Sequence, residues 1–508
     1  MKLNLILYPF LFAIYPLLFF YSRNAWLFPV QELLYAAAVI LGASLITFCL
    51  LVLVLRRAHA AAVLTSAAFL AFFSSEAVFS QFLGLIKLRY VAVIYAALIM
   101  AALYLILRYV RDKKRFTFIL NLVALFLIIL PLFDIARNLY QMNLAKPEAQ
   151  ENIQKEELNN QTSLVGPAPD IYYIILDGYA HTDTLKKHFG FDNTPFYEYL
   201  SSKGFYIVPE SRTNYGITNL SLASSLNMRY LTEKDGASES TFSSYRLINI
   251  ISNNAVYDFL KERGYTSVFV GSGFYGKENF GASVFFVPKK GSSFSRPYKT
   301  FLIAFLESAA HRILDKPATL MFGQVQYVFD QVKEIADSDI PRPIFVFAHV
   351  FAPHLTYDPY DLDPDCNKIT QKKDDQRRYL DRLLCANKEA KEVIDEILAK
   401  STTPPIIILQ SDHGPDFTDE SSQEGKISVT GAQVKLRNFT ALYLPDGGQE
   451  VIPPDLTPVN LFRLIFNHYF GSDYELLEDK SYYVCEFKCL NAKGEAKVFF
   501  DFTEEAKF

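Results

Sequence analysis

The stretch that decides the fold is Ile406-Ile407-Ile408-Leu409, which is followed shortly by Asp412-His413-Gly414. A similar arrangement occurs far upstream, where the apolar run Ile171–Leu176 leads directly into Asp177-Gly178. Short runs of β-branched and aliphatic residues are typical of fully buried parallel strands. Open α/β sheets place their sites at the carboxyl ends of such strands. Two acids and a histidine that meet there indicate a metal site.

Composition divides the chain into an apolar first part and a charged remainder. The 508 residues are 51% hydrophobic, and the first ~140 hold few of the charges. Five apolar runs are long enough to cross about 30 Å of hydrocarbon. The first run could instead be a signal peptide, but it lacks a small-residue cleavage pattern and four more runs follow it. The predicted spans lie at roughly residues 4–22, 32–55, 60–84, 90–110 and 116–139.

The charges of the connecting loops predict the orientation of these spans. Basic residues are concentrated in the loops on the side of the N-terminus, and that excess marks the cytoplasmic side. With five crossings, everything after about Tyr140 then lies outside the cytoplasm. We therefore expect a multi-pass protein of the cell (inner) membrane with an extracytoplasmic domain. The inner loops hold Arg56, Arg57, Arg108, Arg111, Lys113, Lys114 and Arg115, and the outer loops only Arg23, Lys87 and Arg89.

Three regions follow from this pattern: a membrane domain of five helices at 1–140, a linker at 141–169 and an exported domain at 170–508. The linker is polar and lacks apolar periodicity, which predicts a tether or a loosely packed surface helix. From Asp170 onward, strand-like and helix-like patterns alternate. That alternation predicts a mostly parallel central sheet covered by helices.

The cysteines and the net charge agree with an exported domain. Cys49 falls within a predicted span, and four cysteines remain in a compartment that permits disulfides. Four cysteines allow three pairings; we favour Cys366 with Cys385 and Cys485 with Cys489, although some can stay free. A net charge of −4 gives no reason to expect a nucleic-acid partner.

Between the two acidic strand ends lies a candidate nucleophile, Thr218. Gly216 permits a tight turn, and the small and apolar residues from Thr218 onward have helical spacing. A hydroxyl at a helix N-terminus feels the positive end of the helix dipole. A metal ion beside it would lower its pKa and activate it as a nucleophile. Taken alone, however, Thr218 reads as an ordinary N-cap residue.

The order of four motifs along the chain favours a catalytic role for Thr218 over that of an ordinary N-cap. The motifs are strand–Asp–Gly, a Gly-x-Thr helix start, a histidine-rich loop and strand–Ser–Asp–His–Gly. From about Ile171 to Gly471 the chain resembles the alkaline phosphatase and sulfatase superfamily. It is most similar to the membrane-anchored branch, which includes lipoteichoic acid synthases and lipid A phosphoethanolamine transferases. The resemblance implies an alkaline-phosphatase-like fold for the exported domain.

The resemblance also assigns roles to single residues. Asp177, Asp412 and His413 fall on the family's metal ligands, and Thr218 falls on its threonine nucleophile, which also binds metal. Oxygen and imidazole ligands without thiolate suit Zn²⁺ or Mn²⁺. His354 looks like the family's loop histidine, which would bind phosphoryl oxygens or protonate the leaving group.

Other candidates are less specific. His349 ends a buried strand and could contact substrate, support a ligand, bind a second metal ion or simply pack. Arg212 and Asn214 precede Thr218 and could approach substrate oxygens. Three further charged residues follow the Asp-His-Gly, where a cation could neutralise phosphate, although each alone reads as surface charge: Asp416, Lys435 and Arg437.

Two departures from the family patterns limit the functional prediction. The chain has no Cys/Ser-x-Pro-x-Arg pentapeptide, which disfavours ordinary sulfate ester hydrolysis. The lipid-linked transferases mostly have Glu where this chain has Asp177, whereas Asp is common among the phosphatases and phosphodiesterases.

We therefore expect a metal-dependent phosphotransferase that moves a phospholipid-derived headgroup, through a phospho-threonine intermediate, to an envelope glycan or lipid. Its partners would be membrane lipid, a phospholipid donor and that acceptor. A phosphodiesterase of the same superfamily and a non-catalytic envelope protein that kept the fold are the alternatives. A transporter is less favoured, because the sequence shows no paired broken helices.

Overall fold

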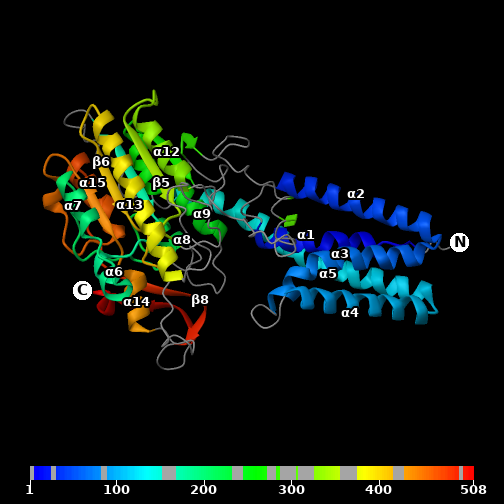
Figure 1. Cartoon of the computed structure of the whole chain (residues 1–508). Coiled ribbons are helices and arrows are strands. Elements are labelled where there is room, and N and C mark those ends of the chain that lie inside the picture. The colour runs from blue at the N-terminus through cyan, green and yellow to red at the C-terminus, as the bar shows by residue number, and fades with distance from the viewer. Residues whose placement is uncertain are drawn as a thin grey trace. The chain divides into compact units, whose positions relative to one another are not determined.

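The computed structural model describes residues 5–24, 30–81, 88–151, 168–231, 244–271, 282–286, 302, 305–306, 325–354, 375–415, 428–490 and 496–508. The chain divides into two compact units (Figure 1). The helical unit contains Met1–Asn143 together with Tyr298–Met321. The α/β unit contains Leu144–Pro297 and Phe322–Phe508.

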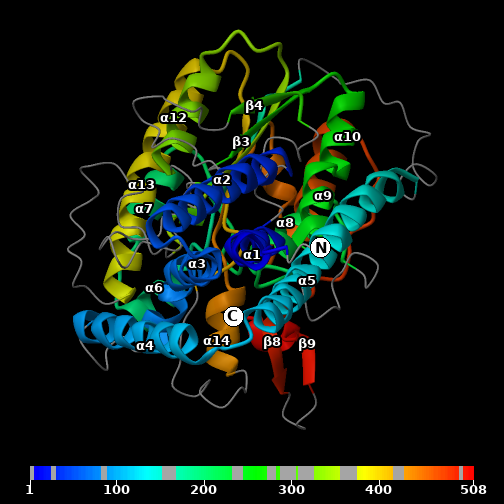
Figure 2. The ribbon, with the colours of Figure 1, turned by 90° about the vertical axis from the view of Figure 1, so that its right-hand side faces the viewer.

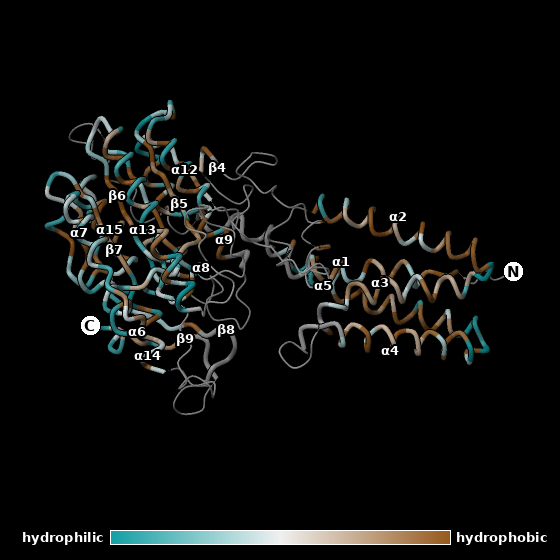
Figure 3. The backbone as a smooth tube through the Cα atoms, in the orientation of Figure 1, coloured by the Kyte–Doolittle hydropathy of each residue, from teal (hydrophilic) through white to brown (hydrophobic). Residues whose placement is uncertain are grey.

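All five predicted apolar runs form helices in the helical unit. Four of these helices contain stretches that are long and apolar enough to cross a membrane: Val30–Leu55, Ala58–Ser75, Tyr90–Tyr109 and Lys113–Arg137. The first helix contributes a shorter apolar stretch, Tyr8–Ser22. Apolar residues dominate these helices along their length (Figure 3). Their bounds are α1 (Tyr8–Asn24), α2 (Val30–Leu55), α3 (Ala58–Gln81), α4 (Leu88–Tyr109) and α5 (Lys113–Glu151).

Helix α5 is longer than the sequence predicted. It has 39 residues and continues to Glu151, so the first part of the predicted linker is helical. Within the helical unit, Asn121 of α5 binds the start of α1: its Oδ1 accepts hydrogen bonds from the backbone N–H groups of Leu7 (3.0 Å) and Tyr8 (2.7 Å). These donors have no partner inside α1, because they lie at its N-terminal end.

A seven-stranded sheet forms the centre of the α/β unit, in the order β2-β7-β6-β1-β5-β3-β4. The five strands from β6 to β4 in this order are parallel, whereas β7 runs antiparallel to both β6 and β2. The predicted mostly parallel sheet is therefore confirmed. The strands are β1 (Ile171–Leu176), β2 (Tyr206–Ile207), β3 (Thr266–Gly271), β4 (Val284–Phe286), β5 (Ile344–Val350), β6 (Ile406–Gln410) and β7 (Thr440–Tyr443).

Helices cover both faces of this sheet, because successive side chains of a strand point to opposite faces. On one face, Tyr172, Ile174 and Leu176 of β1 join a core with residues of α6 (Thr182–Phe189), α7 (Thr194–Ser202), α12 (Val325–Ala336) and α13 (Asp375–Lys400). On the other face, Tyr173 contacts Phe462 of α15 (Pro458–Phe470) edge to face at 5.1 Å. Tyr173 also lies 3.2 Å from the hydroxyl of Ser225 in α8 (Thr218–Leu226). The central strand is thus buried on both sides, as its apolar run predicts.

The remaining elements pack around the sheet. Figure 2 shows α9, α10 and the C-terminal β8–β9 ribbon more openly than Figure 1 does. The C-terminal helix α16 packs against α14, where Ala432, Leu436 and Ala506 form a small core. These elements are α9 (Ser244–Ser252), α10 (Ala255–Glu262), α14 (Val429–Leu436), a 3₁₀ turn at Gly448–Val451, β8 (Tyr482–Leu490), β9 (Ala496–Asp501) and α16 (Thr503–Ala506).

The cysteine predictions are tested only in part by the described residues. Cys385 on α13 is buried and takes part in a disulfide. Its predicted partner Cys366 lies outside the described residues. Cys485 and Cys489 lie in β8, but the placement of their side chains is not described, so the second predicted pairing stays a prediction. Cys49 of α2 is free.

Candidate active site

The carboxyl ends of three adjacent strands bring the predicted acids together. Strand β1 lies between β5 and β6, and Ile175 pairs with His349 on one side and with Gln410 on the other. Asp177 follows β1 directly, and Asp412 follows β6 after one further residue. Asp177, His349 and Asp412 each offer one ligand atom, and these three atoms lie within 4.8 Å of one another.

Both carboxylates are buried and poorly satisfied. Asp177 is 0% exposed and Asp412 is 2% exposed. Asp412 Oδ1 accepts hydrogen bonds from the N–H groups of Gly178 (3.0 Å) and His413 (2.9 Å). Among the described residues, no hydrogen-bond donor reaches Asp412 Oδ2 or either oxygen of Asp177. Buried charges are costly unless they are paired or bind metal, so these three oxygen atoms fit a divalent cation.

His413 presents one ring nitrogen to the same place. Its Nδ1 lies 2.7 Å from the carbonyl oxygen of Gly414, so the N–H at Nδ1 donates to that carbonyl and Nε2 is left as the electron-pair donor. Nε2 lies 3.4 Å from Asp412 Oδ2 and 3.7 Å from Asp177 Oδ1. A histidine whose other nitrogen donates to a carbonyl has the orientation of a metal ligand.

Thr218 joins these groups from a distant part of the chain. Its Oγ1 lies 3.1 Å from His413 Nε2. The N-cap of α8 is Ile217, in an extended conformation with φ −136°, and Thr218 is the first helical residue. The reading of Thr218 as an ordinary N-cap is therefore wrong. Its hydroxyl is directed at the histidine instead of capping its own helix, and it lies at the positive end of the helix dipole.

We call these five residues the acidic cluster: Asp177, Thr218, His349, Asp412 and His413. The histidines in and beside this cluster lower the pKa of the Asp177 carboxyl. Burial by itself raises the pKa of the Asp177 carboxyl, but its electrostatic interactions with His354, His349 and His413 outweigh burial and hold this pKa below its usual range. His349 Nε2 is 3.4 Å from Asp177 Oδ2. The carboxylate is therefore kept ionised, as a metal ligand must be.

Hydroxyl groups hold the backbone of the Asp-His-Gly loop in place. The carbonyl oxygen of Asp412 accepts hydrogen bonds from Thr213 Oγ1 (2.6 Å) and Ser221 Oγ (2.8 Å). Gly414 donates its N–H to the carbonyl of Lys435 at 2.8 Å. A Cβ at Gly414 would lie 1.9 Å from the carbonyl oxygen of Val434, so only glycine fits there.

His354 lies beside the acidic cluster. Its backbone N–H donates to the carbonyl of Asp177 at 2.9 Å, and its ring lies edge-on to that of His413 with centroids 6.3 Å apart. It stacks on Phe351 at 4.7 Å. The tight turn at Gly178, with φ +71°, brings His354 within 3.6 Å of the position that a Cβ would occupy there. The position of His354 therefore suits the predicted contact with substrate.

The predicted substrate contacts of Arg212, Asn214 and Arg437 are less direct, since these side chains bind the protein itself. Arg212 donates to the carbonyl of Thr503 (3.4 Å) and lies 3.6 Å from Asp455. Arg437 donates through Nε to the carbonyl of Ala506 (3.1 Å). Both arginines hold the C-terminal segment, so their predicted role toward substrate stays a prediction.

Asn214 is also occupied by the fold. Its amide group donates to Thr457 (3.0 Å) and to the carbonyl of Lys480 (2.9 Å), and its Oδ1 accepts from the N–H of Val459 (2.8 Å). Lys435 lies close to Gly216, with its Cγ 3.0 Å from where a Cβ would be. The predicted candidate Asp416 lies outside the described residues.

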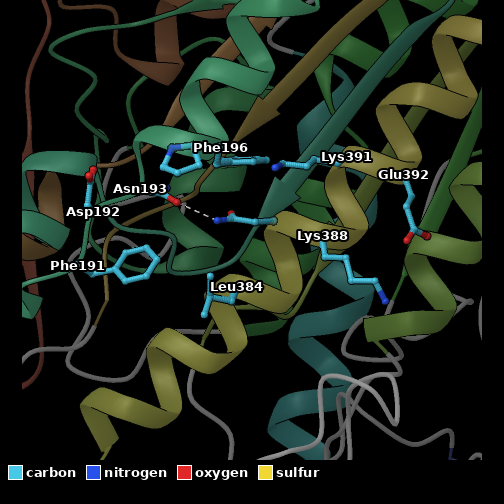
Figure 4. A pocket seen from close by; sticks show the side chains of 10 residues that line it. Phe191, Asp192, Asn193, Phe196, Leu384, Lys388, Lys391 and Glu392 are labelled. Atoms are coloured by element: carbon cyan, nitrogen blue, oxygen red, sulfur yellow. Dashed lines mark hydrogen bonds between the residues drawn. The ribbon is translucent and has the colours of Figure 1, made fainter.

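A second buried polar cluster borders a surface pocket of about 420 Å³ between the α6–α7 segment and α13 (Figure 4). We call it the amide cluster: Tyr179, Asn193 and Asn387. The Tyr179 hydroxyl donates to Asn387 Oδ1 (2.5 Å), Asn387 Nδ2 donates to Asn193 Oδ1 (2.9 Å), and Asn193 Nδ2 donates to the Tyr179 oxygen (2.8 Å). The three side chains form a closed ring of hydrogen bonds.

Sequence reasoning named every member of the acidic cluster but left the role of His349 open. The signal for a ligand role was its position at the end of a strand beside β1. The supporting hydroxyls of Thr213 and Ser221 were missed, as was Tyr379, whose hydroxyl accepts from the N–H of Ala180 (2.9 Å) and donates to the carbonyl of Gly178 (2.9 Å). Nothing local in a sequence distinguishes such hydroxyls from ordinary core polar residues.

Several solved structures are similar to this chain at low sequence identity. The zinc complex of the periplasmic domain of EcEptC from Escherichia coli is 10% identical, with 67% of this chain and 94% of that chain covered and a TM-score of 0.44. The periplasmic domain of phosphoethanolamine transferase EptC from Campylobacter jejuni is 13% identical, with 61% and 92% covered and a TM-score of 0.40.

The integral membrane lipooligosaccharide phosphoethanolamine transferase EptA from Neisseria meningitidis is 12% identical, with 75% of this chain and 69% of that chain covered and a TM-score of 0.39. No curated protein sequence matches the chain. The family model described as Sulfatase matches residues 169–466, more than half of the chain and all of the acidic cluster. The protein is therefore an enzyme of the sulfatase family.

Proposed function

We propose that the protein is a membrane-anchored, metal-dependent phosphotransferase. It moves a phospholipid-derived phospho-headgroup, through a phospho-threonine at Thr218, to an envelope glycan or lipid. The observation that carries this proposal is the 3.1 Å contact between Thr218 Oγ1 and His413 Nε2, beside buried carboxylate oxygens that no donor reaches among the described residues. A hydroxyl at such a position is a nucleophile next to a cation site.

Asp177, Asp412 and His413, with Thr218 Oγ1, would hold the divalent ion, which lowers the pKa of the hydroxyl and offsets charge on the transferring oxygens when bound. Carboxylate and imidazole ligands suit Zn²⁺ or Mn²⁺. His349, 3.4 Å from Asp177, is a further candidate ligand.

The residues of the site divide the reaction into two displacements. In the first, Thr218 Oγ1 attacks phosphorus, and the bond from phosphorus to the lipid oxygen breaks. His354, whose ring centroid lies 6.3 Å from that of His413, would protonate that leaving oxygen. In the second, the acceptor hydroxyl loses its proton and attacks phosphorus, the bond from phosphorus to Thr218 Oγ1 breaks, and Oγ1 takes up a proton, so the phospho-headgroup ends on the acceptor.

The absence of a Cys/Ser-x-Pro-x-Arg motif from the sequence favours phosphoryl over sulfuryl substrates. A hydrolase in which water replaces the acceptor is the second candidate, because Asp177 stands where the resembling lipid-linked transferases mostly have Glu. The two functions differ in where the headgroup goes. Incubation of the purified protein with headgroup-labelled phospholipid and an envelope extract separates them: label on a glycan or lipid supports the transferase, and label released to water supports the hydrolase.

The proposed setting is the inner membrane, with five spans, the N-terminus in the cytoplasm and the catalytic domain (170–508) outside it. Apolar helices and basic loops support this arrangement. A membrane-attached active site meets its lipid donor at high local concentration. The linker at 141–169 begins inside α5, since that helix extends to Glu151.

The direct test is Thr218→Ala in the full-length protein, compared with Thr194→Ala, which changes the first residue of another helix, α7. We expect Thr218→Ala to lower phospholipid turnover by on the order of a thousandfold or more, because the covalent route is lost. Its thermal unfolding midpoint should stay close to that of the wild type. Acid-quenched wild-type protein should carry the phospho-headgroup on Thr218 by mass spectrometry. Unchanged turnover by Thr218→Ala would refute the assignment.

A further inference from the structure

The end of helix α14 holds both ends of the Asp-His-Gly loop. We call residues 435–438, which lead from this helix toward β7, the backing segment. The carbonyl of Lys435 accepts a hydrogen bond from the N–H of Gly414 (2.8 Å). Asn438 Nδ2 donates to the carbonyl of Ser411 (2.5 Å). The two predicted metal ligands of this loop lie between Ser411 and Gly414 in the sequence, so the backing segment fixes the backbone on either side of them.

The backing segment also contacts two other stretches of chain that contribute to the acidic cluster. The carbonyl of Leu436 accepts from the N–H of Thr213 (2.8 Å), and that of Arg437 accepts from the N–H of His181 (3.4 Å). Thr213 precedes the proposed nucleophile by five residues, and His181 follows the first acid by four. A shift of the backing segment would therefore move several members of the acidic cluster relative to one another.

Arg437 fastens the backing segment to residues 502–508, which we call the C-terminal clamp. Its Nε donates to the carbonyl of Ala506 (3.1 Å), and its Nη2 donates to that of Lys507. Its guanidinium carbon lies 4.3 Å from the ring centroid of Phe508. A guanidinium can make these contacts together, because its donors form a rigid fork and its face stacks on aromatic rings. One side chain thus contacts three consecutive residues of the clamp.

On its other side, the clamp is bonded to the chain that leads to Thr218. The N–H of Phe502 donates to the carbonyl of Ser481 (2.9 Å), and the N–H of Ser481 donates to Thr503 Oγ1 (3.1 Å). The Ser481 hydroxyl donates to the carbonyl of Thr213 (2.9 Å). The clamp therefore joins two pieces of backbone, the backing segment and Thr213, that each bond to the Asp-His-Gly loop.

We propose that Arg437 is a positioning residue of the acidic cluster. Through the C-terminal clamp it fixes the backing segment, and so holds the Asp-His-Gly loop in the geometry that binds the metal ion. In this role Arg437 touches no substrate. Ligands that the fold orders in advance bind an ion more tightly, because less ordering is left to binding. The inference deepens the proposed function and rests on it for the metal site.

The metal affinity of the full-length protein tests the proposal. Arg437→Ala should bind Zn²⁺ about tenfold more weakly than the wild type in competition with a chromogenic chelator, because groups that orient the ligands are lost. At saturating Zn²⁺, KM for phospholipid should stay within about twofold of wild type and most of the turnover should return, since the ligands themselves remain.

The matched control is Arg263→Ala. Arg263 also donates to a backbone carbonyl, that of Phe259 (3.0 Å), and its guanidinium lies 3.5 Å from the centroid of the same ring, but it lies at the end of α10. This variant should lower the unfolding midpoint and leave Zn²⁺ affinity unaltered. Arg437→Lys keeps the charge without the fork and should fall between wild type and Arg437→Ala.

Hydrogen exchange of the metal-free protein reports on the loop without metal or turnover. The N–H of Gly414 should exchange about threefold faster or more in Arg437→Ala than in wild type, because its acceptor in the backing segment is held less firmly. Arg263→Ala should not change this rate. Phe508→Ala is a milder change that removes only the ring of the clamp, and it should weaken Zn²⁺ binding about two- to threefold.

Unchanged Zn²⁺ affinity in Arg437→Ala overturns the proposal, and a raised KM in the same variant would assign Arg437 to substrate instead. Equal losses of affinity in Arg437→Ala and Arg263→Ala also overturn it, because a general loss of stability would then explain both. If Arg437→Ala does not fold, unchanged affinity in Phe508→Ala is the overturning result. If the wild type binds neither Zn²⁺ nor Mn²⁺, it is the proposed metal site that fails, and the exchange of Gly414 still decides whether the clamp holds the loop.

Discussion

The acidic cluster and the amide cluster lie close together in the sequence but differ in what their polar atoms contact. In the amide cluster, Tyr179, Asn193 and Asn387 satisfy one another in a closed ring of three hydrogen bonds. The acidic cluster includes Asp177, two residues before Tyr179. Both oxygens of Asp177 and Oδ2 of Asp412 are buried, and no donor among the described residues reaches them.

Natural proteins leave few buried polar atoms unsatisfied, and each exception calls for an explanation. The amide cluster stabilises the fold by itself and requires no ligand, although it borders a pocket (Figure 4). The acidic cluster is stable only if something else compensates its charge, and a cation does so. Unsatisfied buried acceptors therefore locate the site better than the presence of a pocket does.

The largest predicted effect comes from removing one of the unsatisfied carboxylates. Asp412→Asn should lower metal affinity by on the order of a hundredfold or more and abolish turnover, because a charged ligand is lost. The metal-free protein should not be destabilised, because one of two adjacent buried carboxylates is neutralised. Metal content after dialysis against a chelator and the thermal unfolding midpoint check both parts.

The matched control is Asp395→Asn, which changes an exposed carboxylate that pairs with Lys203. It should leave metal content unaltered. If Asp412→Asn binds metal as well as the wild type does, the acidic cluster is not the metal site.

A smaller effect, of a different kind, should follow from opening the amide cluster. Asn387→Ala leaves the Tyr179 O–H without an acceptor and Asn193 Oδ1 without its donor, which should cost about 3 kcal/mol of unfolding free energy. Metal affinity should change little. Denaturant unfolding and metal titration of the same variant measure the two quantities, and Asn253→Ala on the surface is the control. If Asn387→Ala lowered metal affinity but left the unfolding free energy unchanged, the proposed difference between the two clusters would be wrong.

The smallest predicted effect concerns pH and His181, two residues after Tyr179. Burial lowers the pKa of His181 to about 4; Asp183 and a backbone hydrogen bond at Pro209 act against this, and Arg437 adds to it. The folded state thus binds the proton less tightly than the unfolded state, whose histidine has a pKa near 6.5. Stability is fully present above about pH 6.5 and is lost as pH falls toward 4.

Between pH 6.5 and 5 the loss should be about 2 kcal/mol. His181→Asn keeps a side chain that can cap α6 and removes the titration, so its unfolding midpoint should vary less over this pH range. Equal pH dependence in the two proteins would assign the acid sensitivity to other groups.

Much of the site could be predicted because it rests on local patterns. Two buried strands that each lead into an acid placed Asp177 and Asp412 at one sheet edge, and the helix start placed Thr218 nearby. Arg212 and Arg437 show the limit of that approach. Their positions next to the site predicted contact with substrate, but their guanidinium groups bind the carbonyls of Thr503 and Ala506 at the other end of the α/β unit's sequence.

By itself, the sequence determined the apolar helices, the parallel strands and the residues at their ends, because hydrophobic periodicity and strand-terminal acids are read within a few residues. Only the tertiary structure decided that His349 lies beside Asp177 and that the hydroxyl of Thr218 contacts His413. It also decided that Phe305 packs on α1 and α3. The reason is physical. Such contacts join residues tens to hundreds of positions apart, and their partners are selected by the packing of the whole fold, which no local pattern records.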